Sequence, residues 1–263
     1  MKKFAAGVLA VVAVLATTTL QAAIVYDDDV TPDVIFGSGN DNGAFTVDRA
    51  GGVELGLRAK LRFDSANQPQ NIFNSNGDGT YTFNDGLPPI GFGFAPNSTS
   101  TATWNFEWSI NSNFDGSSGF ALDDLTYELG IDFDPGPGTL YQTFDPINTA
   151  FADHAIGTNA TGNGGGTTAA DATQYASLIS TDNVAQNSWN MEFFDSPSFP
   201  FNGAITGQYE IYLAAFSGGN EVARTNITVN VVPEPSSVVL LGIGMVGLAG
   251  YGLRRRKQRQ AAV

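Results

Sequence analysis

The chain has 263 residues, with 12 basic and 26 acidic side chains and a formal charge of −14 at pH 7. This length allows one large domain or two small ones, and the absence of cysteine excludes disulfides, thiol catalysis and thiolate metal sites. Between Ile24 and Pro235, five basic residues face 26 acidic ones, a charge of about −21 that repels nucleic acid and anionic membranes.

The N-terminus predicts a secretory signal peptide over residues 1–22. Lys2 and Lys3 precede an apolar run from Phe4 to Leu15, and the segment TTTLQAA follows it. A positive region, a short apolar region and a zone of small residues are the three parts of a cleavable export signal. We therefore expect an exported domain that begins at residue 23.

Alternation of apolar and polar residues is the clearest signal in the middle of the chain. It runs through VELGLRAKLRF (53–63), TATWNFEWSIN (101–111) and LTYELGIDFD (125–134). A period of two over such lengths is typical of half-buried strands. In the second stretch Trp104 and Trp108 share the apolar face, so we expect them in the core rather than in a sugar-stacking platform. The opposite, Thr/Asn/Ser-bearing face is the better place for weak polar recognition.

Two further alternating stretches, QYEIYLAAF (208–216) and ARTNITVNVV (223–232), flank SGGN and predict a hairpin. Turn formers such as GSGNDNG and DPGPG separate the other strands, and only DATQYASLI (171–179) has the apolar spacing of a helix. The sequence therefore predicts an all-β fold, an antiparallel β-sandwich or jelly-roll-like domain over residues 23–232.

One turn-rich segment predicts a calcium site. In NSNGDGTYTFND, positions 1, 3, 5, 6 and 12 of a calcium-binding loop are filled by Asn74, Asn76, Asp78, Gly79 and Asp85. The alternative is a plain hairpin turn, because YTF alternates like a strand and Asn and Gly favour turns. Apart from calcium, we expect no cofactor.

Catalytic patterns find little support in the sequence. His154, the one histidine, lies in a polar loop without a nearby G-x-S-x-G pattern, and we expect it at the surface. Glu54, Glu107 and Glu128 fall on the polar sides of their strands, where solvated acids are ordinary. Paired carboxylates of a glycoside hydrolase remain an alternative, but the sequence favours a protein without enzymatic activity.

The C-terminus joins a Pro-Glu-Pro triplet to an apolar run and a cluster of arginines. Residues 238–253 measure about 24 Å as a helix at 1.5 Å per residue, somewhat less than the roughly 30 Å core of a bilayer. Snorkelling arginines can close this gap. We therefore predict a transmembrane helix at 238–253, with the basic tail in the cytoplasm and the domain outside.

This tail resembles the PEP-CTERM sorting signal of Gram-negative bacteria. The resemblance rests on Pro233, Glu234 and Pro235, on the Gly-rich span and on the terminal arginines, together residues 233–259. Such tails are also catalogued as ice-binding protein C-terminal domains, a name that is not a sign of ice binding. The resemblance implies that an exosortase, a membrane transpeptidase-like enzyme, cuts at or near the triplet, and that the protein works with exopolysaccharide or biofilm. Residues 24–232 resemble no family.

These patterns predict an exported, exosortase-sorted protein of the cell surface or extracellular matrix, a non-enzymatic structural component linked to exopolysaccharide or biofilm. Its anchor in the inner membrane is expected to be transient. Two alternatives stay open, namely a carbohydrate- or calcium-binding adhesion module and a secreted glycan-active enzyme. The expected partners are the exosortase, exopolysaccharide and the membrane, and nucleic acid is excluded.

Overall fold

A computed structural model describes residues 23–64, 66–68 and 70–234, together with Met245 and Tyr251. The signal peptide predicted at 1–22 lies outside the described residues, and so does nearly all of the span predicted at 238–253. In the described part of the chain, no helix combines the length and the apolar character that a membrane crossing requires.

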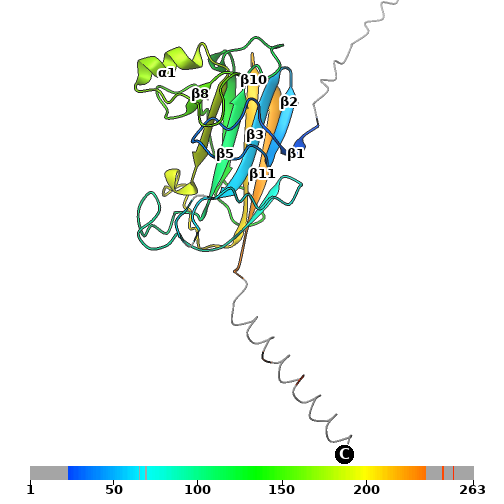
Figure 1. Cartoon of the computed structure of the whole chain (residues 1–263). Helices are drawn as coiled ribbons and strands as arrows, with labels where there is room; N and C mark the ends of the chain where they lie inside the picture. The colour runs from blue at the N-terminus through cyan, green and yellow to red at the C-terminus, as the bar shows by residue number, and fades with distance from the viewer. Residues whose placement is uncertain (1–22, 65, 69, 235–244, 246–250, 252–263) are drawn as a thin grey trace, which may run out of the picture.

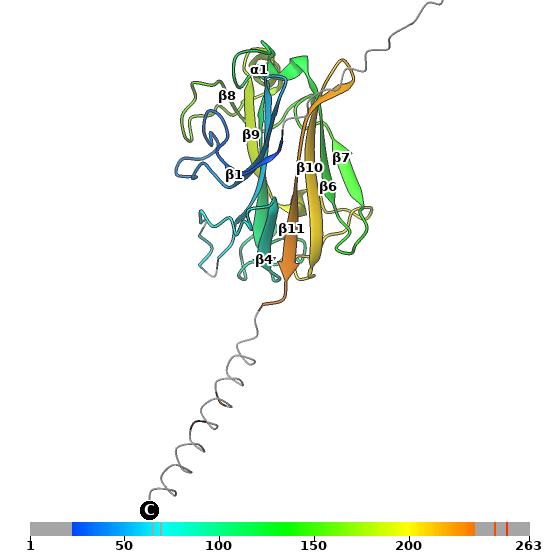
Figure 2. The ribbon, with the colours of Figure 1, turned by 90° about the vertical axis from the view of Figure 1, so that its right-hand side faces the viewer.

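Two β-sheets pack face to face in a sandwich (Figures 1 and 2). Within the described ranges the first sheet has the strand order β1-β2-β3-β5-β9-β8, and the second has the order β4-β11-β10-β6-β7. The elements are β1 Val25–Asp28, β2 Phe45–Ala50, β3 Val53–Leu61, β4 Thr80–Asn84, β5 Trp104–Asn111, β6 Thr126–Asp132, β7 Tyr141–Phe144, β8 Ala155–Gly157, α1 Ala172–Ile179, β9 Val184–Trp189, β10 Gly207–Ser217 and β11 Asn220–Val232, with short 3-10 turns η1 Leu122–Asp124 and η2 Met191–Phe193. The predicted all-β sandwich is therefore confirmed.

One strand pair departs from the antiparallel arrangement that we expected. β4 runs parallel to β11, with Thr80 opposite Thr228 and Asn84 opposite Val232. The other strand pairs of the described residues are antiparallel. Because β4 and β11 lie far apart in the sequence, no hairpin turn dictates their relative direction. Alternation within a strand does not reveal the direction of its partner.

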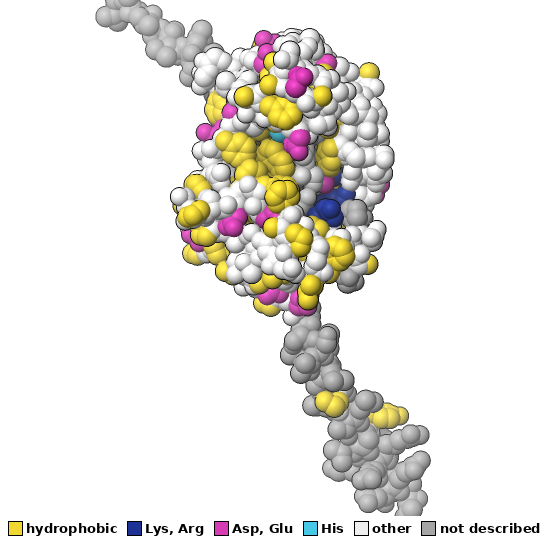
Figure 3. All heavy atoms as spheres, turned by 90° about the vertical axis from the view of Figure 1, so that its left-hand side faces the viewer, with side chains coloured by type: hydrophobic (Ala, Val, Ile, Leu, Met, Phe, Trp, Pro, Cys, Tyr) yellow, Lys and Arg dark blue, Asp and Glu magenta, His cyan; other side chains and the backbone are white. Residues whose placement is uncertain are grey.

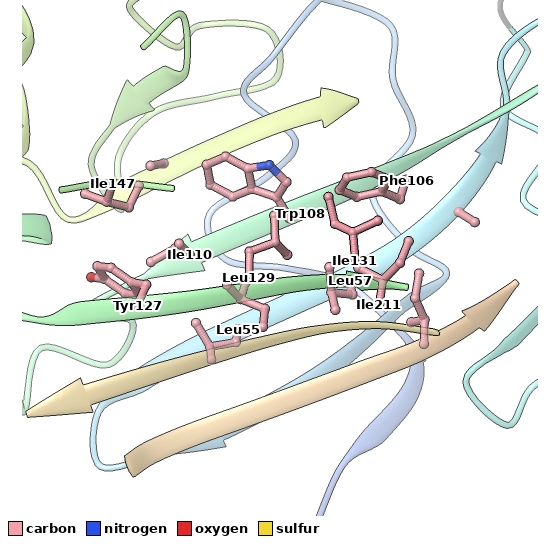
Figure 4. Packing of buried hydrophobic residues seen from close by; sticks show 14 of the residues in the cluster. Leu55, Leu57, Phe106, Trp108, Ile110, Tyr127, Leu129, Ile131, Ile147 and Ile211 are labelled. Atoms are coloured by element: carbon pink, nitrogen blue, oxygen red, sulfur yellow. The ribbon is translucent and has the colours of Figure 1, made fainter. Parts of the chain in front are cut away.

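β5 shows how alternation builds the core. Trp104, Phe106, Trp108 and Ile110 point between the sheets and are at most 1% exposed. They belong to one buried cluster with Leu129 and Ile131 of β6 and Ile211 of β10, whose side chains meet them from the second sheet (Figure 4). The prediction that Trp104 and Trp108 are core residues is confirmed.

The predicted hairpin joins β10 to β11. Ser217 pairs with Asn220 across the turn, and Gly218 and Gly219 have φ angles of 57° and 81°. Two successive positive φ values suit the right-handed twist of a tight hairpin, and glycine adopts them without steric cost. The longest strand pair of the second sheet therefore follows from a local sequence signal.

The predicted helix at 171–179 is α1. Asp171 caps its N-terminus, since its side chain accepts a hydrogen bond of 2.9 Å from the backbone N–H of Gln174. Tyr175 and Ile179 face inward and join the core cluster. The helix therefore closes one end of the sandwich near β8 (Figure 2).

Replacement of Trp108 by alanine tests the assignment of the core. The loss of a fully buried indole should lower the free energy of unfolding by about 3–5 kcal/mol. Ile90 is 91% exposed, so Ile90→Ala is the control and should change stability by no more than about 0.5 kcal/mol. Urea unfolding of both variants measures the difference, and a Trp108→Ala protein as stable as the control would contradict the assignment.

Candidate functional site

The outer face of the six-stranded sheet is not the solvated surface that its polar residues suggested. Residues 29–44, the dark blue segment between β1 and β2, cross in front of this face (Figure 1). Backbone groups of this segment bond to the sheet, for example the Thr31 N–H to Glu54 at 2.7 Å and the Ile35 N–H to Gln186 at 2.8 Å. Glu54 and Glu107 are consequently 0% and 2% exposed. The expectation that they are solvated is wrong.

Arginines neutralise these buried acids. The Arg58 Nε and Nη2 atoms both lie 2.6 Å from Oε2 of Glu107, and the Arg58 guanidinium stacks over the rings of Phe45 and Phe73, with centroids 4.1 and 4.4 Å away. Arg49 pairs with Glu54 in the same way, at 2.6 Å. Burial raises the pKa of Glu54, while its hydrogen bonds from Thr31 and Arg49 lower it. A buried charge is costly unless it is paired, and these ion pairs offset that cost for Glu54 and Glu107.

Glu128, the third acid considered from the sequence, lies on β6 in the other sheet and is partly exposed. Its carboxylate accepts a hydrogen bond of 2.6 Å from the hydroxyl of Tyr212 on β10. The structure therefore does not bring the three glutamates into one site.

The residues of the predicted calcium loop are only partly brought together. Asp78 accepts hydrogen bonds from the N–H and hydroxyl of Thr80 at 3.0 and 2.7 Å, and Asn76 donates to the Thr80 hydroxyl at 2.8 Å. Asn74 accepts at its carbonyl from the Thr82 N–H at 3.0 Å, and Gly79 has a φ of 82° in the same turn. This is the geometry of a hairpin turn.

Asp85 lies at the far end of β4, which separates it from Asp78. A strand rises about 3.3 Å per residue, so the seven steps between these two acids span roughly 20 Å. A calcium ion holds its ligands at about 2.3–2.6 Å. The twelve-residue calcium loop stays a prediction, and the position of Asp85 does not favour it.

An aromatic cavity opens beside the end of β9. β8 pairs with β9 only as far as Gln186, so the residues after it border a cavity of about 520 Å³. Its aromatic wall consists of Phe94, Phe144, Trp189, Phe193 and Phe194. Figure 3 shows this face as a group of hydrophobic side chains with the histidine and acidic groups among them. Its volume lies in the range of small-molecule sites, about 300–1,000 Å³. No periodicity in the sequence singled out these residues.

The rings of this cavity differ in how freely they can meet a ligand. Phe94 and Phe193 are 75% and 46% exposed and meet edge to face, with centroids 5.0 Å apart. Trp189 is half-buried and packs against Phe194 and Trp108, with centroids 5.3 Å away in both cases. The cavity is therefore lined on its inner side by closely packed aromatic rings, and the two accessible rings, Phe94 and Phe193, lie at its edge.

His154 forms the inner end of the cavity and is buried, so the expectation of a surface histidine is wrong. Its Nε2 lies 2.7 Å from the carbonyl of Pro146, and its Nδ1 lies 3.1 Å from the amide nitrogen of Asn187. These partners require a neutral ring that donates to Pro146 and accepts from Asn187. Burial lowers the pKa of His154, although the Pro146 carbonyl and Asp153 oppose this shift. Both nitrogens are thus occupied, and the ring is held as a structural element.

The Pro-Glu-Pro triplet begins where the last strand ends. β11 stops at Val232, whose carbonyl accepts from the Asp85 N–H at 2.8 Å. Pro233 and Glu234 follow directly and are exposed, and the Glu234 N–H donates to the Asp85 carboxylate at 3.1 Å. Pro235 lies outside the described residues. Asp85 therefore fastens the start of the tail to the sandwich.

The profile of the PEP-CTERM protein-sorting motif matches residues 231–257. The chain carries a PEP-CTERM sorting motif. This motif implies export and membrane-anchored sorting toward the cell surface, with an exosortase as the processing partner. The match covers the tail and the last two residues of β11, and the globular region matches no family. The comparisons with curated proteins and with solved structures gave no match.

A pH titration of stability tests the environment of His154. Its pKa is lowered in the folded state, so the unfolded chain takes up the proton first as the pH falls. The wild type should therefore lose stability below about pH 6.5, by at most about 1.4 kcal/mol per pH unit, relative to His154→Gln. Chemical unfolding of both proteins at pH 7.5, 6.5 and 5.5 measures this difference. Parallel pH profiles would contradict the buried, neutral histidine.

Proposed function

We propose that this protein is a non-enzymatic component of the cell surface or extracellular matrix, linked to exopolysaccharide. The main support for the proposal is that the sorting motif follows the domain directly. The match begins at residue 231, inside β11, and Pro233 and Glu234, the first two residues of the triplet, follow directly and are exposed. Sorting by this tail therefore delivers the folded sandwich itself, which is the cargo.

The composition and the electrostatics of the domain support a matrix role. The domain contains no cysteine and rests on its apolar core, and its large negative charge favours solubility outside the cell. Glu54 and Glu107 are held in ion pairs, and both nitrogens of His154 are occupied. These groups are engaged in contacts within the fold, which suits a protein without enzymatic activity.

The aromatic cavity favours a second candidate function, that of a carbohydrate-binding module. A glycan-active enzyme has less support, because the two aspartates at the cavity already accept hydrogen bonds. Asp145 accepts from the N–H groups of Tyr127 and Ile147 at 3.0 and 2.9 Å. Asp153 accepts from the amide of Asn187 at 3.1 Å. Binding of a glycan requires no free acid or base, and it is compatible with these contacts.

Replacement of the Pro-Glu-Pro triplet at 233–235 by three alanines tests the proposed sorting. In cells that contain the exosortase, the variant should still be exported but should remain in the membrane as the full-length chain, because the enzyme has lost its recognition segment. The wild type should lose the segment after the triplet. Mass spectrometry of the membrane and extracellular fractions measures both outcomes.

The double substitution Ser236→Ala with Ser237→Ala is the matched control, since it changes adjacent residues and leaves the triplet intact. It should be processed like the wild type. Normal processing of the triplet variant would contradict the proposal, and the tail would then act as an ordinary membrane anchor.

A further inference from the structure

The few basic side chains of the domain fall into two groups. Arg49, Arg58 and Arg224 each form an ion pair with a carboxylate, at 2.5–2.7 Å. Lys60 and Arg62 form no ion pair with any acid in the described ranges, although all 26 acidic residues of the chain lie there. Two cations of the described residues therefore have no ion-pair partner, in a domain with a charge of about −21.

Both of these cations line the same hollow on the outer face of β3 and β5. It has a volume of about 350 Å³ and also includes Asn105, Glu107 and Ser188. The ammonium group of Lys60 donates one hydrogen bond to the Asn40 side chain, which leaves two N–H groups for a ligand. Glu107 forms its ion pair with Arg58 and attracts Lys60 only through space, as Asp41 does.

Arg62 packs against an aromatic ring and forms no ion pair with the acids of the described residues. Its guanidinium lies over the ring of Phe63, 4.5 Å from the centroid, and its side chain is partly exposed. Burial lowers the pKa of Lys60, so its charged form lacks solvation that a ligand carboxylate would restore. The hollow thus offers the N–H groups of Lys60 and Arg62, to which an anion could bind.

This cationic hollow continues into the aromatic cavity. Ser188 lines both, and a third hollow of about 290 Å³ shares Arg62 and Asn105 with the first and Phe94 and Phe193 with the second. Figure 3 shows basic side chains directly beside the hydrophobic group on this face. Together the three hollows form one groove, with accessible aromatic rings at one end and unpaired cations at the other.

We propose that this groove binds an anionic polysaccharide, a chain of pyranose rings that carries sparse carboxylates, as uronates do. Phe94 and Phe193 contact the apolar faces of the rings, Asn105 and Ser188 bond to hydroxyl groups, and Lys60 and Arg62 bind the carboxylate. The proposal rests on the proposed matrix function and names the partner that holds the domain in the matrix.

Charge density favours a glycan over a nucleic acid. A single-stranded nucleic acid also offers rings and negative charge, but it places a phosphate on every nucleotide and its binding sites neutralise many of them. The groove offers the cations Lys60 and Arg62, and Asp145, Asp153 and Glu192 border it in addition to the ion-paired Glu107. Widely spaced carboxylates can bind at the two cations alone. Closely spaced phosphates would also lie next to the acids, which would repel them.

Titration of the full-length protein in detergent micelles tests the proposal. The probes are an oligogalacturonate, its carboxyl-reduced neutral form and an oligothymidylate of similar length. The oligogalacturonate should bind about tenfold more tightly than the other two, and its affinity should fall as salt rises. Arg62→Gln should weaken this binding about tenfold, and Phe193→Ala should weaken the binding of both glycans.

Arg224→Gln is the matched control, because it removes the same charge from the second sheet, where Arg224 pairs with Glu221. It should leave affinity within about twofold of the wild type. Equal losses for Arg62→Gln and Arg224→Gln, equal affinity for the neutral glycan, tighter binding of the oligothymidylate, or no binding would each overturn the proposal. Processing of the tail is measured separately, so normal sorting without glycan binding would refute the groove and leave the proposed function standing.

Discussion

The buried ion pair between Arg58 and Glu107 organises the outer side of this sandwich. Arg58 is fully buried and joins three parts of the chain, since it bonds to Glu107 of β5 and to the carbonyls of Asp41 and Gly43 at 2.8 and 2.7 Å. Removal of one partner would leave an uncompensated charge in the interior. The pair therefore fixes the segment that covers the sheet, and this segment in turn sets the depth of the cationic hollow.

This arrangement explains how a strongly acidic domain can present a cationic groove. Arg49 and Arg58 form ion pairs with buried glutamates, whereas the buried Lys60 and the partly exposed Arg62 line the hollow on the same face. The chain leaves the sandwich at the end of β11, while the groove opens beside β9 (Figures 1 and 3). The first residues of the tail, Pro233 and Glu234, are not among the residues that line the groove.

Local signals predicted the features that depend on local physics. Alternation placed Trp104 and Trp108 in the core, glycines placed the β10–β11 turn, and the triplet and basic tail placed the sorting motif. The parallel pairing of β4 and the burial of Glu54 and Glu107 depend on segments far away in the chain, which periodicity does not report.

The groove is the least predictable feature for the same reason. It combines residues of β3, β5 and β9 with the loop around Phe94 and the end of β7 at Phe144, and only the folded chain brings these together. The sequence predicted weak polar recognition on the Thr/Asn/Ser-bearing face of residues 101–111, and Asn105 of this face does line the groove. The aromatic part had no signal, because Phe193 and Phe194 lie at the end of the three-residue 3-10 turn η2, which is too short to produce a periodic pattern.

If the sorted domain belongs to the extracellular polysaccharide, its location should depend on that polymer. Fractionation of cells that produce the polysaccharide, and of cells in which its synthesis has been removed, measures this dependence. The processed protein should stay with the polysaccharide in the first cells and should appear free in the medium in the second. An unchanged distribution between the two, with processing intact, would contradict this prediction.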